Sequence, residues 1–344
     1  MRKIYRILDA NFNRAREALR VIEDFARFVL DDADLSSSAK DMRSRLRQSM
    51  ECFGADAMLA TRDTPGDVGT AITSATEADR PDAAAVATAA CKRLTESLRT
   101  LEEYAKVANP ASSGQFESMR YAAYTLEQRL TMRLAGSERF NAVRLYVLLT
   151  SRLCRSDPVA TAQAAIAGGA DCIQVREKEM PDRKLLAHAR RLREITRTAG
   201  ALLIINDRPD IAAIVGADGV HLGQDDLPVA EARRSLGEGG AIVGVSTHNI
   251  SQARAAVADG ADYIGVGPMF PTTTKDAGPI AGVAYLKEIV AEISLPHVAV
   301  GGITVGNVGE LVAAGARRAA VCSAVIAAAD PAAAAAEIKK QLTP

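Results

Sequence analysis

The chain has 344 residues, enough for about two domains at a typical ~150 residues per domain. Hydrophobic residues make up 48% of it and charged residues 24%, and Lys+Arg and Asp+Glu both number 42, so that the formal net charge is zero. This balance is typical of a globular protein and lacks the basic excess of nucleic-acid binding, so any anion must be bound by locally placed charge.

The chain shows no sign of secretion or of a membrane span. No apolar signal segment precedes Asp9, and the most apolar stretches, such as residues 201–205, are too short to cross a bilayer. The five cysteines, odd in number and without C-x-x-C spacing, are Cys52, Cys91, Cys154, Cys172 and Cys322. We therefore expect reduced thiols in a cytoplasmic protein with neither membrane nor nucleic acid as partner, and leave homo-oligomerisation open.

Residues 1–135 are predicted to form a helical domain. From Phe12 to Val29, apolar residues recur every three or four positions, the rhythm of one helix face. Further helical patterns cover residues 36–50, 82–108 and 115–134. A polar, glycine-containing loop spans residues 62–70.

An internal repeat lies within this half. The segment RAREALRVIEDFAR (14–27) aligns without gaps on RLTESLRTLEEYAK (93–106), which indicates an all-α helical bundle with a pseudo-twofold arrangement. The repeat matches Glu17, Arg20, Glu23 and Asp24 with Glu96, Arg99, Glu102 and Glu103.

These charges have two interpretations. In the first they form ion pairs on a helix surface, and the domain is a spacer or a dimer contact. In the second, Arg20 and Arg99 face one polar cleft that binds a pyrimidine phosphate and is closed by the loop 62–70. That loop would contribute Gly66 and Gly69 for close approach to phosphate, and Asp63 or Asp67 for a metal.

Residues 136–344 alternate short aliphatic or β-branched runs with Ala-rich helical stretches. The predicted strands are 144–150, 172–177, 201–206, 219–222, 241–246, 262–267, 297–301 and 318–323. Helical segments follow them, and several end in a Gly-Ala pair (at Gly169, Gly260 and Gly315), as a glycine C-cap would. Eight such units predict a closed α/β (β/α)8 TIM barrel. An open doubly wound sheet is the alternative, but no Gly-rich phosphate loop follows the first strand.

In such a barrel the active site lies at the carboxyl ends of the strands. The second predicted strand ends in QVREK, where a period of two puts Gln174, Arg176 and Lys178 on one face and Val175 and Glu177 on the other. Two cations and an amide suit an anionic substrate. A strand-edge charge cluster is the alternative.

Oxygen ligands follow the next two strands. Asn206-Asp207 ends the third, and a turn ending in Asp226 follows the fourth. Because no Cys or His cluster accompanies them, we predict that Asp207 and Asp226 bind Mg²⁺ rather than Zn²⁺. For each carboxylate taken singly, the alternative is a helix N-cap or an ordinary surface residue.

Hydroxyls and glycines follow the remaining strands. Ser246 begins a segment that either donates hydrogen bonds inward or caps the next helix. The loop 267–275 is rich in hydroxyls and ends in a cation. The last two strands end in Gly301-Gly302 and Cys322-Ser323, at the usual phosphate site of a barrel.

In this order, the segments resemble the thiamine-phosphate synthase family. They are QVREK (174–178), IIND (204–207), DGVHLGQDDLP (218–228), GVSTHN (244–249), DYIGVGPMFPTTTK (262–275), AVGGIT (299–304) and VCSAV (321–325). The resemblance covers essentially the whole barrel. It implies a transferase of thiamine biosynthesis that condenses 4-amino-2-methyl-5-(diphosphooxymethyl)pyrimidine with thiazole phosphate, giving thiamine phosphate and pyrophosphate.

The resemblance also implies residue roles. The catalytic residues would be Arg176, Lys178, Ser246 and Lys275, and Asp207 and Asp226 would hold Mg²⁺. The substrate-binding residues would be Gln174, Val175, Arg176, Glu177, Lys178, Asn206, Ser246, Thr272, Thr273, Thr274, Lys275, Gly302, Cys322 and Ser323. Both substrates are small molecules, and pyrophosphate would leave in a dissociative step.

The alternatives for the barrel are a thiazole tautomerase and a non-catalytic sensor. A sister branch tautomerises the thiazole, but by resemblance it has a His where Pro268 stands and lacks the full diphosphate set. A non-catalytic sensor of a phosphorylated ligand would not need the metal positions.

The helical half has its own resemblance. The segment ANFNRAREALRVIEDFARF resembles an N-terminal domain of some bacterial synthases, and a related stand-alone unit has been proposed to phosphorylate the pyrimidine precursor. No P-loop or kinase Gly-rich motif is present, so the sequence does not itself indicate a kinase.

Overall fold

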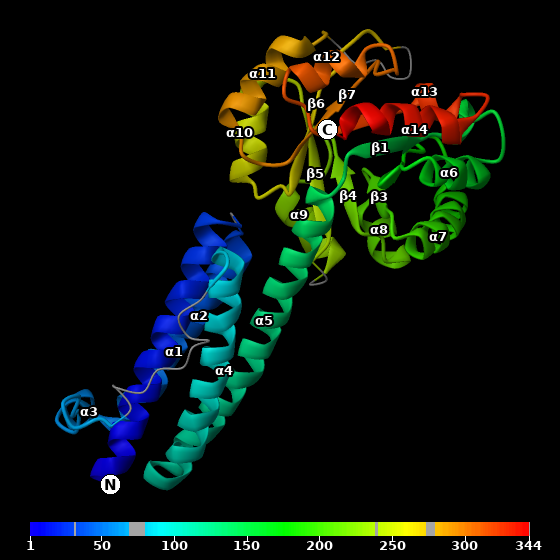
Figure 1. The fold of residues 1–344 in the computed structure, drawn as a ribbon. Helices are drawn as coiled ribbons and strands as arrows, with labels where there is room; N and C mark the ends of the chain where they lie inside the picture. The colour runs from blue at the N-terminus through cyan, green and yellow to red at the C-terminus, as the bar shows by residue number, and fades with distance from the viewer. Residues whose placement is uncertain (31, 69–79, 238–239, 273–278, 344) are drawn as a thin grey trace. The chain divides into compact units, whose positions relative to one another are not determined.

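The computed structural model describes residues 1–30, 32–68, 80–237, 240–272 and 279–343 (Figure 1). The chain forms two compact units, Met1–Leu134 and Ala135–Pro344. The helix α5 (Ser113–Asn141) continues from the first unit into the second.

Every regular element among the described residues of the first unit is a helix, as predicted. Its other elements are α1 (Arg2–Phe28), α2 (Ala33–Met50), η1 (Glu51–Phe53), α3 (Ala55–Leu59), α4 (Ala83–Ala108) and η3 (Pro110–Ser112). The first helix starts at Arg2, ten residues before the apolar rhythm begins. Asp32 and Asp82 cap α2 and α4 by accepting hydrogen bonds from the backbone N–H groups of Leu35 and Ala85.

The internal repeat forms the core of this unit. Residues at matched positions of α1 and α4 are fully buried, since Leu19 and Leu98 both have 0% exposure, as do Ile22 and Leu101. The repeat therefore supplies the same apolar face twice, and the two helices pack together through it.

The charged positions of the repeat form ion pairs. Arg20 lies 3.2 Å from Asp24, and Arg99 lies 2.7 Å from Glu102. The interpretation of a shared polar cleft remains a prediction, because Gly69 and Thr70 of its closing loop lie outside the described residues.

Each repeat also joins its glutamate to the helix that follows. Glu23 pairs with Arg43 of α2 at 2.8 Å, and Glu102 pairs with Arg120 of α5 at the same distance. The repeated feature is thus a helix pair closed by one buried carboxylate.

The second unit is the predicted barrel. Its strands are β1 (Leu145–Leu149), β2 (Cys172–Val175), β3 (Leu202–Asn206), β4 (Gly219–Leu222), β5 (Ile242–Thr247), β6 (Tyr263–Val266), β7 (His297–Val300) and β8 (Ala319–Val321). All neighbours pair in parallel, and β8 closes on β1 with Tyr146 opposite Ala320. The open-sheet alternative is therefore wrong.

Helices surround the strands (Figure 1). They are η4 (Ser151–Leu153), α6 (Pro158–Ala167), α7 (Asp182–Ala199), α8 (Pro209–Val215), α9 (Val229–Leu236), α10 (Ile250–Ala258), α11 (Gly282–Glu292), α12 (Val308–Ala313), α13 (Ser323–Ile326) and α14 (Pro331–Leu342). The predicted glycine caps are present, since Gly169, Gly260 and Gly315 have φ of 98°, 77° and 101°.

Alternation along the strands makes two separate apolar layers. One set of side chains, including Val147, Ile173 and Val220, packs outward against the helices. The other set, including Ile204 and Tyr263, fills the barrel interior. The inward polar residues near the strand ends therefore sit above a filled core and face a common opening.

No helix among the described residues is both long and apolar enough to span a membrane.

Candidate active site

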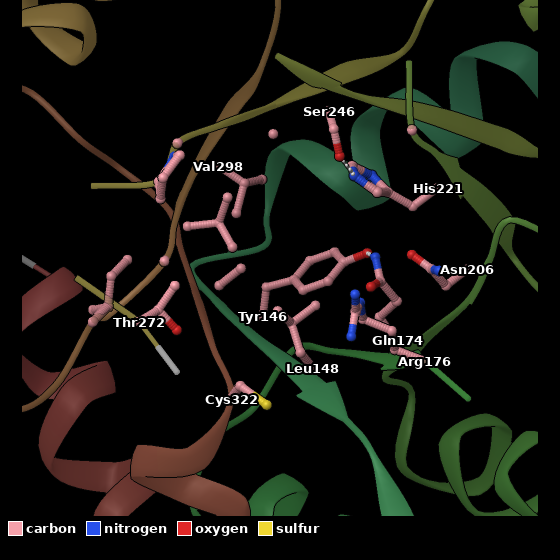
Figure 2. Close-up of a pocket in the computed structure, with 18 of the residues that line it drawn as sticks. Tyr146, Leu148, Gln174, Arg176, Asn206, His221, Ser246, Thr272, Val298 and Cys322 are labelled. Atoms are coloured by element: carbon pink, nitrogen blue, oxygen red, sulfur yellow. Dashed lines mark hydrogen bonds between the residues drawn. The ribbon is translucent and has the colours of Figure 1, made fainter. Parts of the chain in front are cut away.

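A cavity of about 440 Å³ opens at the carboxyl ends of the barrel strands (Figure 2). Every strand or the segment after it contributes to its lining. The predicted site residues that line it are Gln174, Arg176, Lys178, Asn206, Asp207, Asp226, Ser246, Thr272, Gly302, Cys322 and Ser323. The fold thus gathers groups spread over 150 residues of sequence into one pocket, which a parallel barrel does by bringing all its strand ends together.

Among the described residues of the predicted substrate-binding set, Val175 and Glu177 are not part of this lining. Val175 is 1% exposed in the outer apolar layer, and Glu177 accepts hydrogen bonds from the Ser151 backbone N–H and Oγ, both at 2.6 Å. The alternation that turns Arg176 and Lys178 inward turns these two side chains outward. Neither side chain lines the cavity, and the part of Val175 and Glu177 in substrate binding stays a prediction.

The predicted metal pair lies beside a cation. Lys178 Nζ is 3.3 Å from Asp207 Oδ2, and Asp226 Oδ2 accepts a hydrogen bond from the Gly223 N–H at 2.6 Å. Neither carboxylate caps a helix, since Arg208 and Pro228 occupy the N-cap positions of α8 and α9.

The electrostatics of this pair suit a cation. Burial raises the pKa of the Asp207 carboxyl, the neighbouring Asp226 carboxyl raises it further, and Lys178 opposes both effects. A bound divalent cation would relieve the repulsion between the two carboxylates. The described residues contain no group of three or more His, Cys, Asp or Glu that could hold a metal. Two carboxylates fit Mg²⁺, which commonly takes one or two from the protein and completes its shell with phosphate oxygens and water.

The backbone at Asp207 is unusual. Its φ is +62°, in the left-handed region that few residues other than glycine adopt, and its N–H donates to the His221 carbonyl at 2.8 Å. Asp tolerates this region better than most residues. The conformation directs the carboxylate to the cavity directly after β3.

Another part of the cavity lining is glycine backbone. Gly302 has φ +64°, and a Cβ there would lie 2.4 Å from the Pro271 carbonyl oxygen, so a larger residue is excluded. Asn307 Nδ2 holds the Gly302 carbonyl at 2.9 Å. Cys322 and Ser323 line the cavity where β8 ends and α13 begins. Thr273, Thr274 and Lys275 lie outside the described residues.

The segment that starts at Ser246 was predicted either to face the cavity or to cap the next helix. Ser246 lines the cavity, whereas Asn249 caps α10 by accepting from the Gln252 N–H at 3.0 Å. Both roles occur, in different residues.

A row of hydrogen-bonded polar side chains was not predicted. Tyr146, Tyr263 and His221 line the cavity floor between Gln174 and Ser246, and consecutive members are 2.9 Å apart. Burial raises the pKa of both tyrosines well above the ordinary value, so both hydroxyls are neutral. A signal was available in the sequence, because all three occupy inward positions of their strands.

Fold and cavity together define a β/α-barrel enzyme whose mouth is built for phosphorylated substrates. The chain belongs to the thiamine monophosphate synthase family, whose model matches residues 145–325. Residues 6–129 match the model of the ThiD2 family.

Relatives match both units together. A thiamine-phosphate synthase of Synechocystis is 42% identical over 99% of this chain and 96% of its own length. One from Thermosynechococcus vestitus is 41% identical over 99% of this chain and 95% of its own. Among solved structures, the thiamine phosphate pyrophosphorylase of Pyrococcus furiosus has a TM-score of 0.55 and 37% identity, over 59% of this chain and 96% of that one.

Proposed function

We propose that the barrel joins 4-amino-2-methyl-5-(diphosphooxymethyl)pyrimidine to thiazole phosphate, giving thiamine phosphate and pyrophosphate. The observation that carries this proposal is that the same cavity is lined by two groups of residues suited to anions. Arg176, Lys178 and the carboxylate pair form one group, and the backbone at Gly302 and the start of α13 form the other.

Arg176 and Lys178 are proposed to bind the diphosphate. Arginine offers a planar fork to phosphate oxygens and lysine a compact charge. In the reaction the bond between the pyrimidine methylene carbon and the diphosphate oxygen breaks, and its electron pair leaves with pyrophosphate. The two cations stabilise the charge that grows on that oxygen, which is the main electrostatic task of the site.

Asp207 and Asp226 are proposed to hold Mg²⁺. When bound, the ion supplies positive charge that neutralises the departing pyrophosphate. Lys178 Nζ is 3.3 Å from Asp207 Oδ2 and is proposed to interact with both the carboxylate pair and the diphosphate.

The other group is proposed to hold the thiazole phosphate. Thr272, Gly302, Cys322 and Ser323 offer hydroxyls and backbone N–H groups there. Fixing this phosphate positions the thiazole nitrogen to form its bond to the methylene carbon as pyrophosphate departs. Thr273, Thr274 and Lys275 are assigned to binding, and Lys275 to catalysis, on the family resemblance alone.

The alternatives are less well supported. The cavity is lined by Pro268, where the tautomerase branch has a His, and its lining includes every described residue of the predicted diphosphate set, Gln174, Arg176, Lys178, Asn206 and Ser246. A sensor would not require two carboxylates held next to each other against their mutual repulsion.

We further propose that residues 136–344 make up the complete synthase and residues 1–135 a separate helical domain. A pyrimidine-phosphate site and a spacer or dimer contact both remain open for that domain. Calorimetry of residues 1–135 with pyrimidine monophosphate distinguishes the two roles. If no heat of binding is measured, only the spacer or dimer contact is left.

The synthase function is tested by incubating the purified chain with Mg²⁺ and each substrate alone, and then with both. We expect thiamine phosphate when both are present and none with either alone. Binding of both substrates without any product would support the sensor, and conversion of the thiazole phosphate alone to an isomer would support the tautomerase.

A further inference from the structure

Five side chains form a continuous hydrogen-bonded row across the floor of the cavity. Gln174 Nε2 donates to Tyr146 Oη at 2.9 Å, and Tyr146 Oη lies 2.9 Å from Tyr263 Oη. Tyr263 Oη lies 2.9 Å from His221 Nδ1, and His221 Nε2 lies 2.9 Å from Ser246 Oγ. Figure 2 labels Tyr146 beside Gln174, and His221 with its bond to Ser246.

The row connects five different strands. Its members come from β2, β1, β6, β4 and β5 in that order. Its centre is buried, since Tyr146 and Tyr263 are 2% and 1% exposed. Buried hydroxyls need partners, and here each hydroxyl finds both within the row.

While each member bonds its neighbours in the row, the hydrogens can run in only two directions. Each tyrosine hydroxyl has one hydrogen, and a neutral imidazole carries a hydrogen on one of its two nitrogens. If Gln174 donates to Tyr146, then Tyr146 donates to Tyr263, Tyr263 donates to His221 Nδ1, and His221 Nε2–H donates to Ser246. Reversal at one member would leave a hydrogen pointing at a hydrogen, so all members reverse together or none does.

The direction decides what the two ends present to a ligand. In the direction that starts from the Gln174 amide N–H, the Gln174 carbonyl oxygen remains as an acceptor and the Ser246 O–H remains as a donor. In the reverse direction Gln174 would present its NH₂ group, and Ser246 would present only lone pairs.

We propose that Tyr146, Tyr263 and His221 are positioning residues that set the hydrogen-bonding polarity of Gln174 and Ser246, and thereby select an amino-substituted pyrimidine diphosphate. This inference rests on the proposed function. An exocyclic amine donates to the Gln174 oxygen, whereas an oxo group would meet it oxygen to oxygen. A diphosphate oxygen has only lone pairs and needs the Ser246 O–H.

The geometry around the row preserves this arrangement. Phe140 stacks on the Tyr263 ring at 4.0 Å between centroids, and a Cβ on Gly244 would lie 2.1 Å from Tyr263 Cζ. The Tyr263 ring therefore has little room to rotate away. Gln224 Nε2 donates to the Ser246 carbonyl at 2.6 Å, which fixes the serine backbone.

The substrate-free protein tests the direction. Nitrogen-15 NMR of the full chain, with the His221 signals assigned by their loss in His221→Gln, reports which ring nitrogen carries the hydrogen. We expect the Nε2–H tautomer. The Nδ1–H tautomer in the wild type would overturn the proposed direction, and this result does not depend on any activity.

Two variants each remove one hydroxyl from the row. Tyr263→Phe keeps the ring but removes the donor to His221, so we expect a mixture of tautomers. Tyr146→Phe breaks the row between Gln174 and Tyr263, so the Gln174 amide no longer fixes the direction of the remaining bonds, and we again expect a mixture of tautomers. Tyr285→Phe is the matched control, because the Tyr285 hydroxyl bonds Thr247 Oγ1 at 2.8 Å outside the row. An unchanged tautomer in either variant would show that the row does not set the tautomer of His221.

The consequence for selectivity is measured with the 4-oxo analogue of the pyrimidine diphosphate. We expect the wild type to favour the amino substrate in kcat/KM, and both Tyr146→Phe and Tyr263→Phe to reduce that preference by on the order of 10-fold. If both variants kept the wild-type preference for the amino substrate, the row would have no role in substrate selection. If the wild type made no thiamine phosphate at all, the proposed function would be wrong. The tautomer measurement would still test the direction of the hydrogen bonds in the row.

Discussion

Gly244 of β5 leaves the space that the ring of Tyr263 of β6 occupies. A Cβ at residue 244 would lie 2.1 Å from Tyr263 Cζ and 2.5 Å from its Oη, far inside van der Waals contact. The absence of a side chain at one strand position thus permits a large aromatic ring at the centre of the barrel, and with it the hydrogen bond to His221.

Gly244→Ala is therefore expected to destabilise the barrel by about 1–3 kcal/mol, the usual effect of overpacking a core. Thermal unfolding of the full chain measures it. Gly306→Ala is the control, because a Cβ there would meet its nearest atom, Thr304 Oγ1, at an ordinary 3.8 Å. Equal midpoints for the two variants would mean that the Tyr263 ring moves aside freely.

Asp207→Asn is expected to lower turnover by on the order of 10²-fold, because it removes charge that holds the cation next to the departing pyrophosphate. Asparagine also tolerates the φ of +62°, so the backbone should be preserved. Steady-state rates at saturating Mg²⁺ measure the loss. Asp225→Asn, an exposed neighbour of Asp226 that does not line the cavity, should retain the wild-type rate. A normal rate in Asp207→Asn with Mg²⁺ still required would show that the metal is bound elsewhere.

Residues 136–344 alone are expected to make thiamine phosphate at a rate close to that of the full chain. This fragment retains Phe140 and every residue that lines the cavity, and the Pyrococcus furiosus protein is covered over 96% of its length by 59% of this chain. Assays at equal molar concentration measure it. A folded fragment that is inactive, but regains activity when residues 1–135 are added, would contradict independence of the barrel.

Glu102→Gln is expected to destabilise the helical unit by roughly 2 kcal/mol at neutral pH, the scale of a hydrogen bond to a charged group. Glu102 is 3% exposed and accepts from Arg120 Nε at 2.8 Å. Burial raises the pKa of this carboxyl, but Arg120 and Arg99 outweigh burial and hold the pKa below its ordinary value. Glu103→Gln, at an exposed position, should cost less than about 0.5 kcal/mol.

The same pair predicts a pH dependence. Because the folded-state pKa of Glu102 is lowered, its contribution is fully present above the ordinary glutamate pKa and is lost as the pH falls through the folded value. The stability gap between wild type and Glu102→Gln should therefore narrow in acid. Calorimetric scans at neutral pH and in steps below about pH 4.5 check this. A gap that stays constant would mean that Arg120 does not stabilise the carboxylate.

Much of the fold could be predicted from the sequence because its signals are local. Each predicted strand overlaps an observed one, and the predicted range 219–222 matches β4. The predicted range 318–323 extends past β8, because Ser323 starts a helix of four residues, which is too short to show a helical period in the sequence. The inward face of Gln174, Arg176 and Lys178 also followed from the period of two alone.

The polar row could not be predicted in the same way. Tyr146 and Tyr263 are 117 residues apart, and their contact depends on closure of the barrel and on the space left by Gly244. In a strand such as LYVLL, a tyrosine is also an ordinary core residue. Only the assembled interior distinguishes a hydroxyl that pairs across the barrel from one that packs among aliphatic side chains.

A crystal structure of the full chain with Mg²⁺, pyrophosphate and thiamine phosphate tests the central claim most directly. In this proposal one part of the barrel cavity receives the pyrophosphate and another part receives the thiazole phosphate. We predict pyrophosphate and Mg²⁺ against Arg176, Lys178, Asp207 and Asp226, and the thiazole phosphate against Gly302 and Ser323. Pyrophosphate bound at Gly302, or products bound outside the barrel, would contradict the account.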